Sequence, residues 1–417
     1  MLKQLQEKLG PGLLYAATAI GVSHLISSTQ AGANFGLIMI GYMVFMCLLK
    51  YPTFLFGAQY TAATGESLIG GYERKGRWIL FLFFLMQMFE YTMAISGVAV
   101  TTSALFQSIF NLKLNIILLQ FILVGACLAI LAIGKYALLE GITKVLVIIM
   151  TFGVIAAAGI AVFGVDTQGA DLSATLIFDK TTLLFLIAVA GWMPTGMAGA
   201  VAISVWVKAK EERLGRNIPI NEAKFDFNLG YGASIFTAIC FVTMGSLLMY
   251  APGVKVAGGG AAYADQLMSL FTQTLGGWTY PIIAIAAITV MGSTLLTLVD
   301  LLPRTSSVIV TRLMPEKFSD SNKQAHLYIG FIAVELILVF IVLTTLQDPQ
   351  KFGEFMQLVT SLGFVVAPII AFLNHIVMFS DVVPKDKQPG QGLRVWSYIT
   401  IASMLAISLI LLYLNVT

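Results

Sequence analysis

The stretch AIGVSHLISS, residues 19–28, places polar and flexible residues in the middle of the first long apolar run of the chain. Within a helix, a glycine such as Gly21 is less favourable than alanine by about 1 kcal/mol. A histidine such as His24 is rare at membrane depth unless it faces a partner or a cavity. Together with Ser23, these residues predict an unwound hinge in an otherwise apolar helix.

The composition shows what kind of protein contains this hinge. The 417 residues are 58% hydrophobic and 11% charged, with a mean hydropathy of +0.89. Soluble domains carry about 25% charged residues, so this composition predicts a polytopic membrane protein. The formal net charge of +3 is too small to suggest a nucleic-acid partner. All three cysteines lie inside apolar runs, where we expect isolated core thiols rather than disulfides or metal clusters.

Apolar runs of about 20 residues are candidate membrane helices. We expect eleven of them, at residues 11–35, 37–62, 77–105, 114–134, 139–165, 183–207, 227–250, 278–302, 326–346, 353–378 and 394–415. Basic residues concentrate in alternate connections, including the segments at 73–77 (ERKGR) and 208–217 (KAKEERLGRN). Cytoplasmic loops carry an excess of Lys and Arg. We therefore predict an integral protein of the plasma (inner) membrane, with a cytoplasmic N-terminus and an external C-terminus.

A second interruption lies in the sixth run, where AGWMPTGMAG at residues 190–199 crowds Gly191, Pro194 and Gly196 together. A proline in a helix interior costs roughly 3 kcal/mol. A matched pair of broken helices in two halves of a chain points to the substrate site of a transporter. The spacing predicts one transmembrane domain over residues 1–417, with repeats at about 11–165 and 183–378 and an extra helix at about 394–415.

Four motifs in this order resemble the NRAMP divalent-metal transporters. The segment GPGLLYAATAIGVSHLISSTQAGANFG, residues 10–36, is similar to the opening of that family, whose broken first helix carries Asp-Pro-Gly-Asn and whose sixth carries Met-Pro-His. QMFE at 87–90 stands where the family has Asp-x-x-Glu, and QLVTSLG at 357–363 where it has a glutamine near the metal. The resemblance covers the first ten spans. It implies an all-α, LeuT-type fold of five plus five inverted helices with helices 1 and 6 broken.

The chain departs from the family at the metal site itself. Read without gaps, Asp-Pro-Gly-Asn becomes Gly-Val-Ser-His at residues 21–24, and Met-Pro-His becomes Met-Pro-Thr at residues 193–195. Loss of the anionic ligand removes the strongest attraction for a divalent cation. We therefore expect a degraded transition-metal site and leave the identity of any metal open. The resemblance implies a substrate site at Gly21, Ser23, His24, Met193, Thr195 and Gln357.

Ionisable residues inside the spans allow several interpretations. His24 is a soft metal ligand acting with Met193, a proton-coupling group, or a fixed hydrogen-bond partner of a carbonyl, and the sequence leaves these open. Glu90 matches the glutamate that the family retains, and we predict that it relays protons together with His24. Lys50 is expected to reach the membrane interface with its long side chain.

Two charged pairs have helical spacing. Glu140 and Lys144 are four residues apart, which places them on one helix face, and we interpret them as a structural pair near the surface. Asp300 lies four residues before Arg304 and is predicted to be interfacial.

We expect a proton-coupled secondary transporter that moves a small solute or a cation across the bilayer. No nucleophile–base pattern suggests an enzyme, and no motif suggests a cofactor. One alternative is a carrier of a small organic solute such as an amino acid, whose carboxylate would meet the N-terminal ends of the half-helices. Another is a relative that does not transport and acts as a sensor or scaffold.

Overall fold

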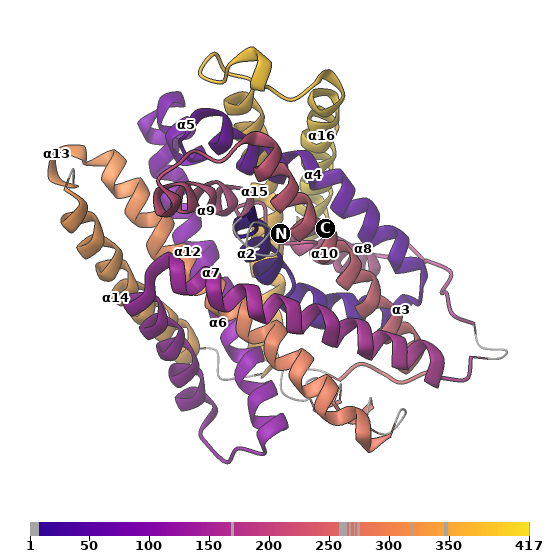
Figure 1. The fold of residues 1–417 in the computed structure, drawn as a ribbon. Helices are drawn as coiled ribbons and strands as arrows, with labels where there is room; N and C mark the ends of the chain where they lie inside the picture. The colour runs from indigo at the N-terminus through magenta and orange to yellow at the C-terminus, as the bar shows by residue number, and fades with distance from the viewer. Residues whose placement is uncertain are drawn as a thin grey trace.

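A computed structural model describes residues 8–167, 171–257, 265–266, 268–270, 272, 276–318, 320–345 and 349–416. In this part of the chain the structure is a bundle of helices (Figure 1), and the one β pairing is an isolated bridge between Gly36 and Ser173. The all-α polytopic fold predicted from the sequence is confirmed.

The first half of the chain starts with a helix that breaks and resumes. Its elements are α2 (Pro11–Ala19), the π-helical turn η1 (Ser23–Ser28), α3 (Thr29–Phe35), α4 (Ile38–Thr64), α5 (Leu68–Lys75), α6 (Arg77–Phe110) and α7 (Ile116–Gly164). Local sequence explains several ends. Pro11 occupies the first turn of α2, where its missing N–H costs nothing. Gly65 ends α4 in a left-handed conformation that suits glycine.

The second half contains the other interrupted helix. Its elements are α8 (Lys180–Trp192), α9 (Gly199–Leu214), α10 (Ile220–Gly245) with η2 (Ser246–Tyr250), η3 (Gly277–Thr279), α12 (Tyr280–Leu313), α13 (Pro315–Phe318), α14 (Ser321–Thr345), α15 (Pro349–Met378), η4 (Lys385–Lys387) and α16 (Gln391–Val416). α12 packs against α2, α6, α7 and α14, so it lies inside the bundle. α10 packs against α2, α3, α4 and α7.

Two apolar segments form where the fourth and fifth spans were predicted, and helical backbone rather than a loop joins them through residues 134–138 within α7. This segment contains a glycine but no proline, so nothing in it forces the helix to stop. A straight helix of this length would measure about 74 Å, more than twice the hydrocarbon thickness of about 30 Å. Figure 1 shows the chain turning between the two halves, which are the apolar segments Ile116–Ile133 and Tyr136–Gly164.

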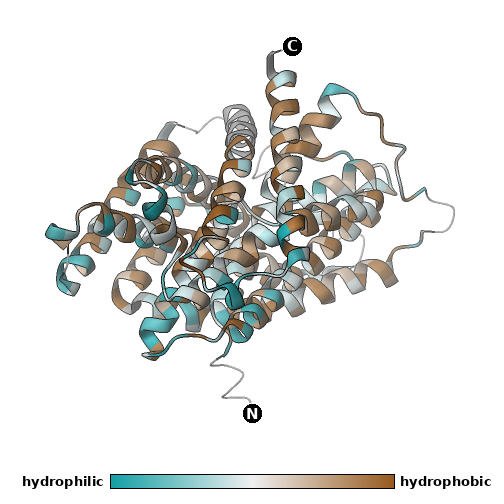
Figure 2. Cartoon of the chain, turned by 90° about the horizontal axis from the view of Figure 1, so that it is seen from above, coloured by the Kyte–Doolittle hydropathy of each residue, from teal (hydrophilic) through white to brown (hydrophobic). Residues whose placement is uncertain are grey.

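The outer helices expose large apolar side chains. Phe163 is 92% exposed, Ile133 84% and Phe152 70%, all on α7. Figure 2 shows apolar residues along most of the length of the helices. Within the described residues, eight helices are long and apolar enough to cross a membrane, and Lys180–Trp192 and Gly363–Met378 are shorter apolar helices. Exposed apolar area of this extent needs a lipid environment, so the protein is an integral membrane protein.

Candidate substrate site at the two helix breaks

The first break joins α2 to η1 and lies against α12. A Cβ added to Gly21 would lie 2.5 Å from Thr294 Cγ2, so only glycine fits this approach without movement of its neighbour. Thr294 Oγ1 lies 2.7 Å from Ala17 O and 3.1 Å from Ile20 O. The last carbonyls of a helix have no partner within the helix. The hydroxyl of Thr294 therefore offers a hydrogen-bond donor to the carbonyls at the end of α2 that lack a partner within the helix.

The second break, residues 193–198, separates α8 from α9 and touches the first. Met193 is extended and fully buried, and its peptide bond to Pro194 is cis. Thr195 follows and is 8% exposed. Ser23 Oγ lies 3.4 Å from Pro194 O. The structure thus brings Ser23 to the segment that contains Met193 and Thr195, so five of the six residues expected at the substrate site lie in or beside the two breaks.

His24 is held from both sides of its ring. Its Nε2 lies 2.9 Å from Ser234 O of α10, and its Nδ1 lies 3.0 Å from Ser23 Oγ. A carbonyl only accepts hydrogen bonds, so Nε2 carries a proton. The imidazole is fully buried. This geometry matches a fixed hydrogen-bond partner, while the roles of His24 as a metal ligand and as a proton carrier stay predictions.

Glu90 reaches the second break from α6. A Cβ added to Gly196 would lie 2.6 Å from Glu90 Oε1, so the missing side chain at Gly196 leaves room for the carboxylate. One turn earlier, Gln87 Nε2 donates to Ser306 Oγ of α12 at 3.1 Å. Gln357 belongs to α15, and its side chain lies outside the described part of the structure.

Lys50 is not at the interface, and that prediction is wrong. Its side chain is fully buried, and Nζ donates to Ala190 O and, at 2.9 Å, to Gly191 O. Both carbonyls belong to the last turn of α8, beside the second break. The ring of Phe364 on α15 lies 5.9 Å from Nζ. The partners of Lys50 come from the other half of the chain, so its place in its own helix could not reveal them.

The two charged pairs form as expected, and their carboxylates are buried. Lys144 Nζ lies 2.7 Å from Glu140 Oε1, although Glu140 is only 1% exposed. Arg304 lies 2.6 Å from Asp300. Asp300 is fully buried, and it also accepts from Trp206 Nε1 at 2.9 Å. A side chain of α14 also donates to it, so α9 and α14 both cover Asp300, and its interfacial depth stays a prediction.

The N-terminal end of α2 packs closely against α10. Asp226 on α10 accepts hydrogen bonds from the N–H groups of Gly10 at 3.0 Å and Gly12 at 2.8 Å. A Cβ on Gly12 would lie 1.9 Å from Asp226 O, and one on Gly230 would lie 1.9 Å from Gly12 O. The two backbones are in direct contact here, which leaves no space for a side chain or a solute.

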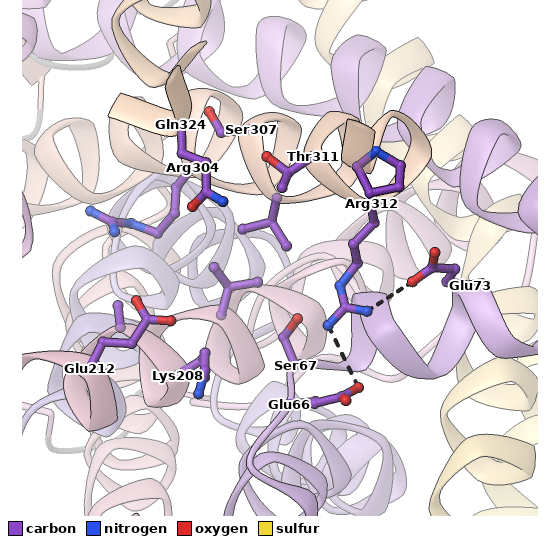
Figure 3. Close-up of a pocket in the computed structure, with 14 residues that line it drawn as sticks. Glu66, Ser67, Glu73, Lys208, Glu212, Arg304, Ser307, Thr311, Arg312 and Gln324 are labelled. Atoms are coloured by element: carbon purple, nitrogen blue, oxygen red, sulfur yellow. Dashed lines mark hydrogen bonds and ion pairs between the residues drawn. The ribbon is translucent and has the colours of Figure 1, made fainter. Parts of the chain in front are cut away.

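A pocket of about 490 Å³ whose lining includes several charged side chains lies between α5, α9 and α12 (Figure 3). Arg312 extends toward two acidic groups, Glu73 at 2.8 Å and Glu66 at 3.6 Å, while Lys208 and Glu212 line the opposite wall. None of the described residues expected at the substrate site lines this pocket. It lies among the basic segments that the charge pattern assigns to the cytoplasmic side, beyond the break along α9.

The structure adds two residues that the sequence did not single out, Thr294 and Tyr15, and it gives Lys50 a position that the sequence did not predict. Tyr15 on α2 stacks on Tyr231 with ring centroids 5.7 Å apart. Its buried hydroxyl has no hydrogen-bond partner among the described residues. The only available signal was a polar residue within an apolar run, which many structural residues share.

Metal-binding groups are sparse in the part of the chain that the structure describes. No three His, Cys, Asp or Glu side chains gather there in a group that could hold a metal ion. The thiols of Cys47 and Cys240 are free and buried, and that of Cys127 is free and partly buried.

Comparison with solved structures identifies the fold. A mutant of the manganese transporter of Eremococcus coleocola superposes with a TM-score of 0.75 at 15% sequence identity, over 98% of this chain and 86% of that one. MhsT, solved in complex with L-phenylalanine, superposes with a TM-score of 0.69 at 16% identity, over 97% and 98% of the two chains. The LeuT-type fold predicted from the sequence is thereby confirmed.

No family model matches the sequence. The uncharacterised protein PM0681 of Pasteurella multocida is nevertheless a relative, 31% identical over 392 residues that cover 93% of this chain and 87% of that protein. This chain belongs to the same family as PM0681, and its fold is the one shared by the manganese transporter and MhsT.

Proposed function

We propose that this protein is a secondary active transporter that binds its substrate between the two helix breaks. The contact between Ser23 Oγ and Pro194 O carries the proposal, because it joins the two interruptions within the bundle. Irregular backbone at membrane depth is tolerated where it is buried in protein or lines a cavity. Paired discontinuous helices form the substrate sites of many transporters. The shared fold of a manganese transporter and of MhsT supports this assignment.

The groups around the breaks favour a small organic solute with a carboxylate over a divalent cation. Gly21 replaces the aspartate that the resemblance would place there. The N-cap residues of η1 and α9 are Val22 and Ala198, and neither side chain caps its helix. The N-terminal end of a helix carries about half a positive charge. We expect a substrate carboxylate to bind at these two ends. The binding of L-phenylalanine by MhsT, which shares the fold, favours an amino acid as the substrate.

The coupling ion in this proposal is a proton, and Glu90 carries it. The carboxylate lies against Gly196 in the second break, where it can respond to substrate and to helix movement. Its charge also acts on Lys50. His24 is the weaker candidate, because both of its ring nitrogens already have partners.

The test begins with a thermal-shift screen of the purified protein against amino acids and divalent metals, since a ligand that binds the native state raises its Tm. The best solute then enters uptake assays in proteoliposomes with and without an imposed pH gradient. We expect the gradient to accelerate uptake by the wild type. Glu90→Gln should remove that response while retaining substrate binding. His24→Ala should lower binding and keep the response, and Glu140→Gln serves as a control outside the breaks.

Two results would contradict the proposal. If no solute is taken up, the chain is better described as a sensor or scaffold. If uptake occurs and Glu90→Gln responds to the gradient like the wild type, Glu90 does not carry the coupling proton.

A further inference from the structure

A buried ammonium group lies at the negative end of the interrupted helix α8. The last carbonyls of a helix lack partners within the helix, and the aligned peptide dipoles place about half a negative charge there. At the end of α8 these carbonyls are Ala190 O and Gly191 O, and both accept hydrogen bonds from Lys50 Nζ. Lys50 therefore occupies a position that would attract a cation.

Groups from several helices surround this ammonium group. Cys47 lies one turn earlier on α4, Glu90 on α6 acts on Lys50 through its charge, and Phe364 on α15 presents its ring at 5.9 Å. The side chain of Lys50 is fully buried. A buried ammonium is strongly unfavourable unless its charge is compensated. Here the α8 carbonyls, a carboxylate and an aromatic face all contribute to that compensation.

The location distinguishes Lys50 from an ordinary structural lysine. The carbonyls that it holds come directly before the break at residues 193–198, which also contacts Ser23 and Glu90. In transporters with discontinuous helices, half-helix C-terminal ends coordinate the coupling cations. The ammonium group of Lys50 is a cation at such an end, and unlike a free ion it is covalently attached to a neighbouring helix.

We propose that Lys50 is a tethered cation that replaces an inorganic cation on the C-terminal carbonyls of α8, an inference that rests on the proposed function as a transporter. The fixed positive charge repels a divalent metal ion at the breaks and attracts a carboxylate. It also makes the α8 end independent of any free cation during transport. Lys50 is in this sense a specificity-determining residue for the substrate site.

The test uses the full-length protein with Lys50→Ala and Lys50→Met, the second of which keeps much of the side-chain volume. Tm is measured at constant ionic strength in choline, sodium, potassium, manganese and methylammonium chloride. We expect the Tm of the wild type to be the same in all five salts. In choline chloride the Tm of both variants should fall by about 2–7 °C, because two buried carbonyls lose their donor. Sodium or methylammonium should restore about half of that loss by occupying the vacated carbonyls.

Lys210→Ala is the matched control. Lys210 is also buried, and its Nζ donates to a backbone carbonyl, Lys8 O, at 2.6 Å. It lies near the end of α9 that is remote from the break. This variant should lose stability with no recovery that depends on the salt.

The outcomes separate this inference from the proposed function. If the Lys50→Met protein folds and its Tm depends on the salt in the same way as that of the wild type, Lys50 does not act as a tethered cation, whether or not uptake is found. A Lys50→Met protein that folds in none of the five salts also overturns this inference, because a free cation then cannot replace the ammonium group. A variant that folds only with methylammonium supports it. Absence of uptake by the wild type overturns the proposed function and leaves the Tm comparison readable.

Discussion

Asp226 holds the N-terminal end of α2 against α10, and its replacement by asparagine is expected to release that end. The carboxylate accepts hydrogen bonds from two N–H groups, those of Gly10 and Gly12. The side-chain nitrogen of asparagine cannot accept a hydrogen bond. Asp226→Asn therefore leaves one of the two buried N–H groups without its acceptor.

The size of the effect follows from these contacts. A buried donor without a partner costs about 1–3 kcal/mol. Loss of the negative charge at the N-terminal end of α2 costs a further 0.3–1 kcal/mol or so. The sum of roughly 1.3–4 kcal/mol corresponds to a roughly 10- to 700-fold shift toward the released state, at about 1.4 kcal/mol per tenfold. Removal of a buried charge offsets part of this cost, so we expect the lower half of the range.

The assay measures access of water-soluble reagents to α2. Ala16 is fully buried on that helix, so Ala16→Cys, in a background without the three native cysteines, reports its release. Asp226→Asn should accelerate maleimide labelling of this cysteine at least tenfold, in keeping with the shift derived above. Asp179→Asn is the control, because Asp179 Oδ1 caps the N-terminal end of α8 at 2.7 Å from Thr182 N in an exposed position. An unchanged labelling rate in a folded Asp226→Asn protein would show that the carboxylate does not hold α2 against α10.

Three further predictions concern the breaks and the topology. Gly21→Ala should lower the free energy of unfolding by about 1–3 kcal/mol, since its Cβ would meet Thr294, and Thr294→Ala should recover part of the loss in thermal unfolding. The wild type should bind Mn²⁺ weakly or not at all in calorimetry, because no acid stands at position 21, and tight binding would disprove a degraded metal site. Cysteines introduced at Lys180 and Arg213 should be labelled from outside and inside the cell, respectively, and the reverse result would invert the proposed orientation.

The two interruptions could be predicted from sequence because their causes are local. Glycine and proline weaken a helix wherever they occur in its interior. Gly21 and Pro194 therefore predict a break in their apolar runs without knowledge of any partner. The helical spacing of Glu140 and Lys144 likewise suffices to predict their ion pair.

The groups that complete the breaks could not be predicted, because their partners are distant in the chain. Lys50 lies 140 residues from the carbonyl of Ala190, and Thr294 lies 277 residues from that of Ala17. A lysine near the middle of a span looks the same in sequence whether it extends to the interface or meets a half-helix end. The difference arises only when the two halves of the chain pack together.

The hydroxyl of Thr294 also bears on how α2 can move. Three carbonyl oxygens lie within reach of Oγ1, those of Ala17 at 2.7 Å, Val290 at 2.9 Å and Ile20 at 3.1 Å. A hydroxyl donates one proton, so it bonds to one of them at a time. When α2 tilts away, rotation about a single bond lets the hydroxyl turn to Val290 on its own helix and keep a partner. Thr294 thus allows the two helices to separate while its hydroxyl keeps a hydrogen-bond acceptor. Valine has the same shape but no hydroxyl, so it could not make this exchange of partners.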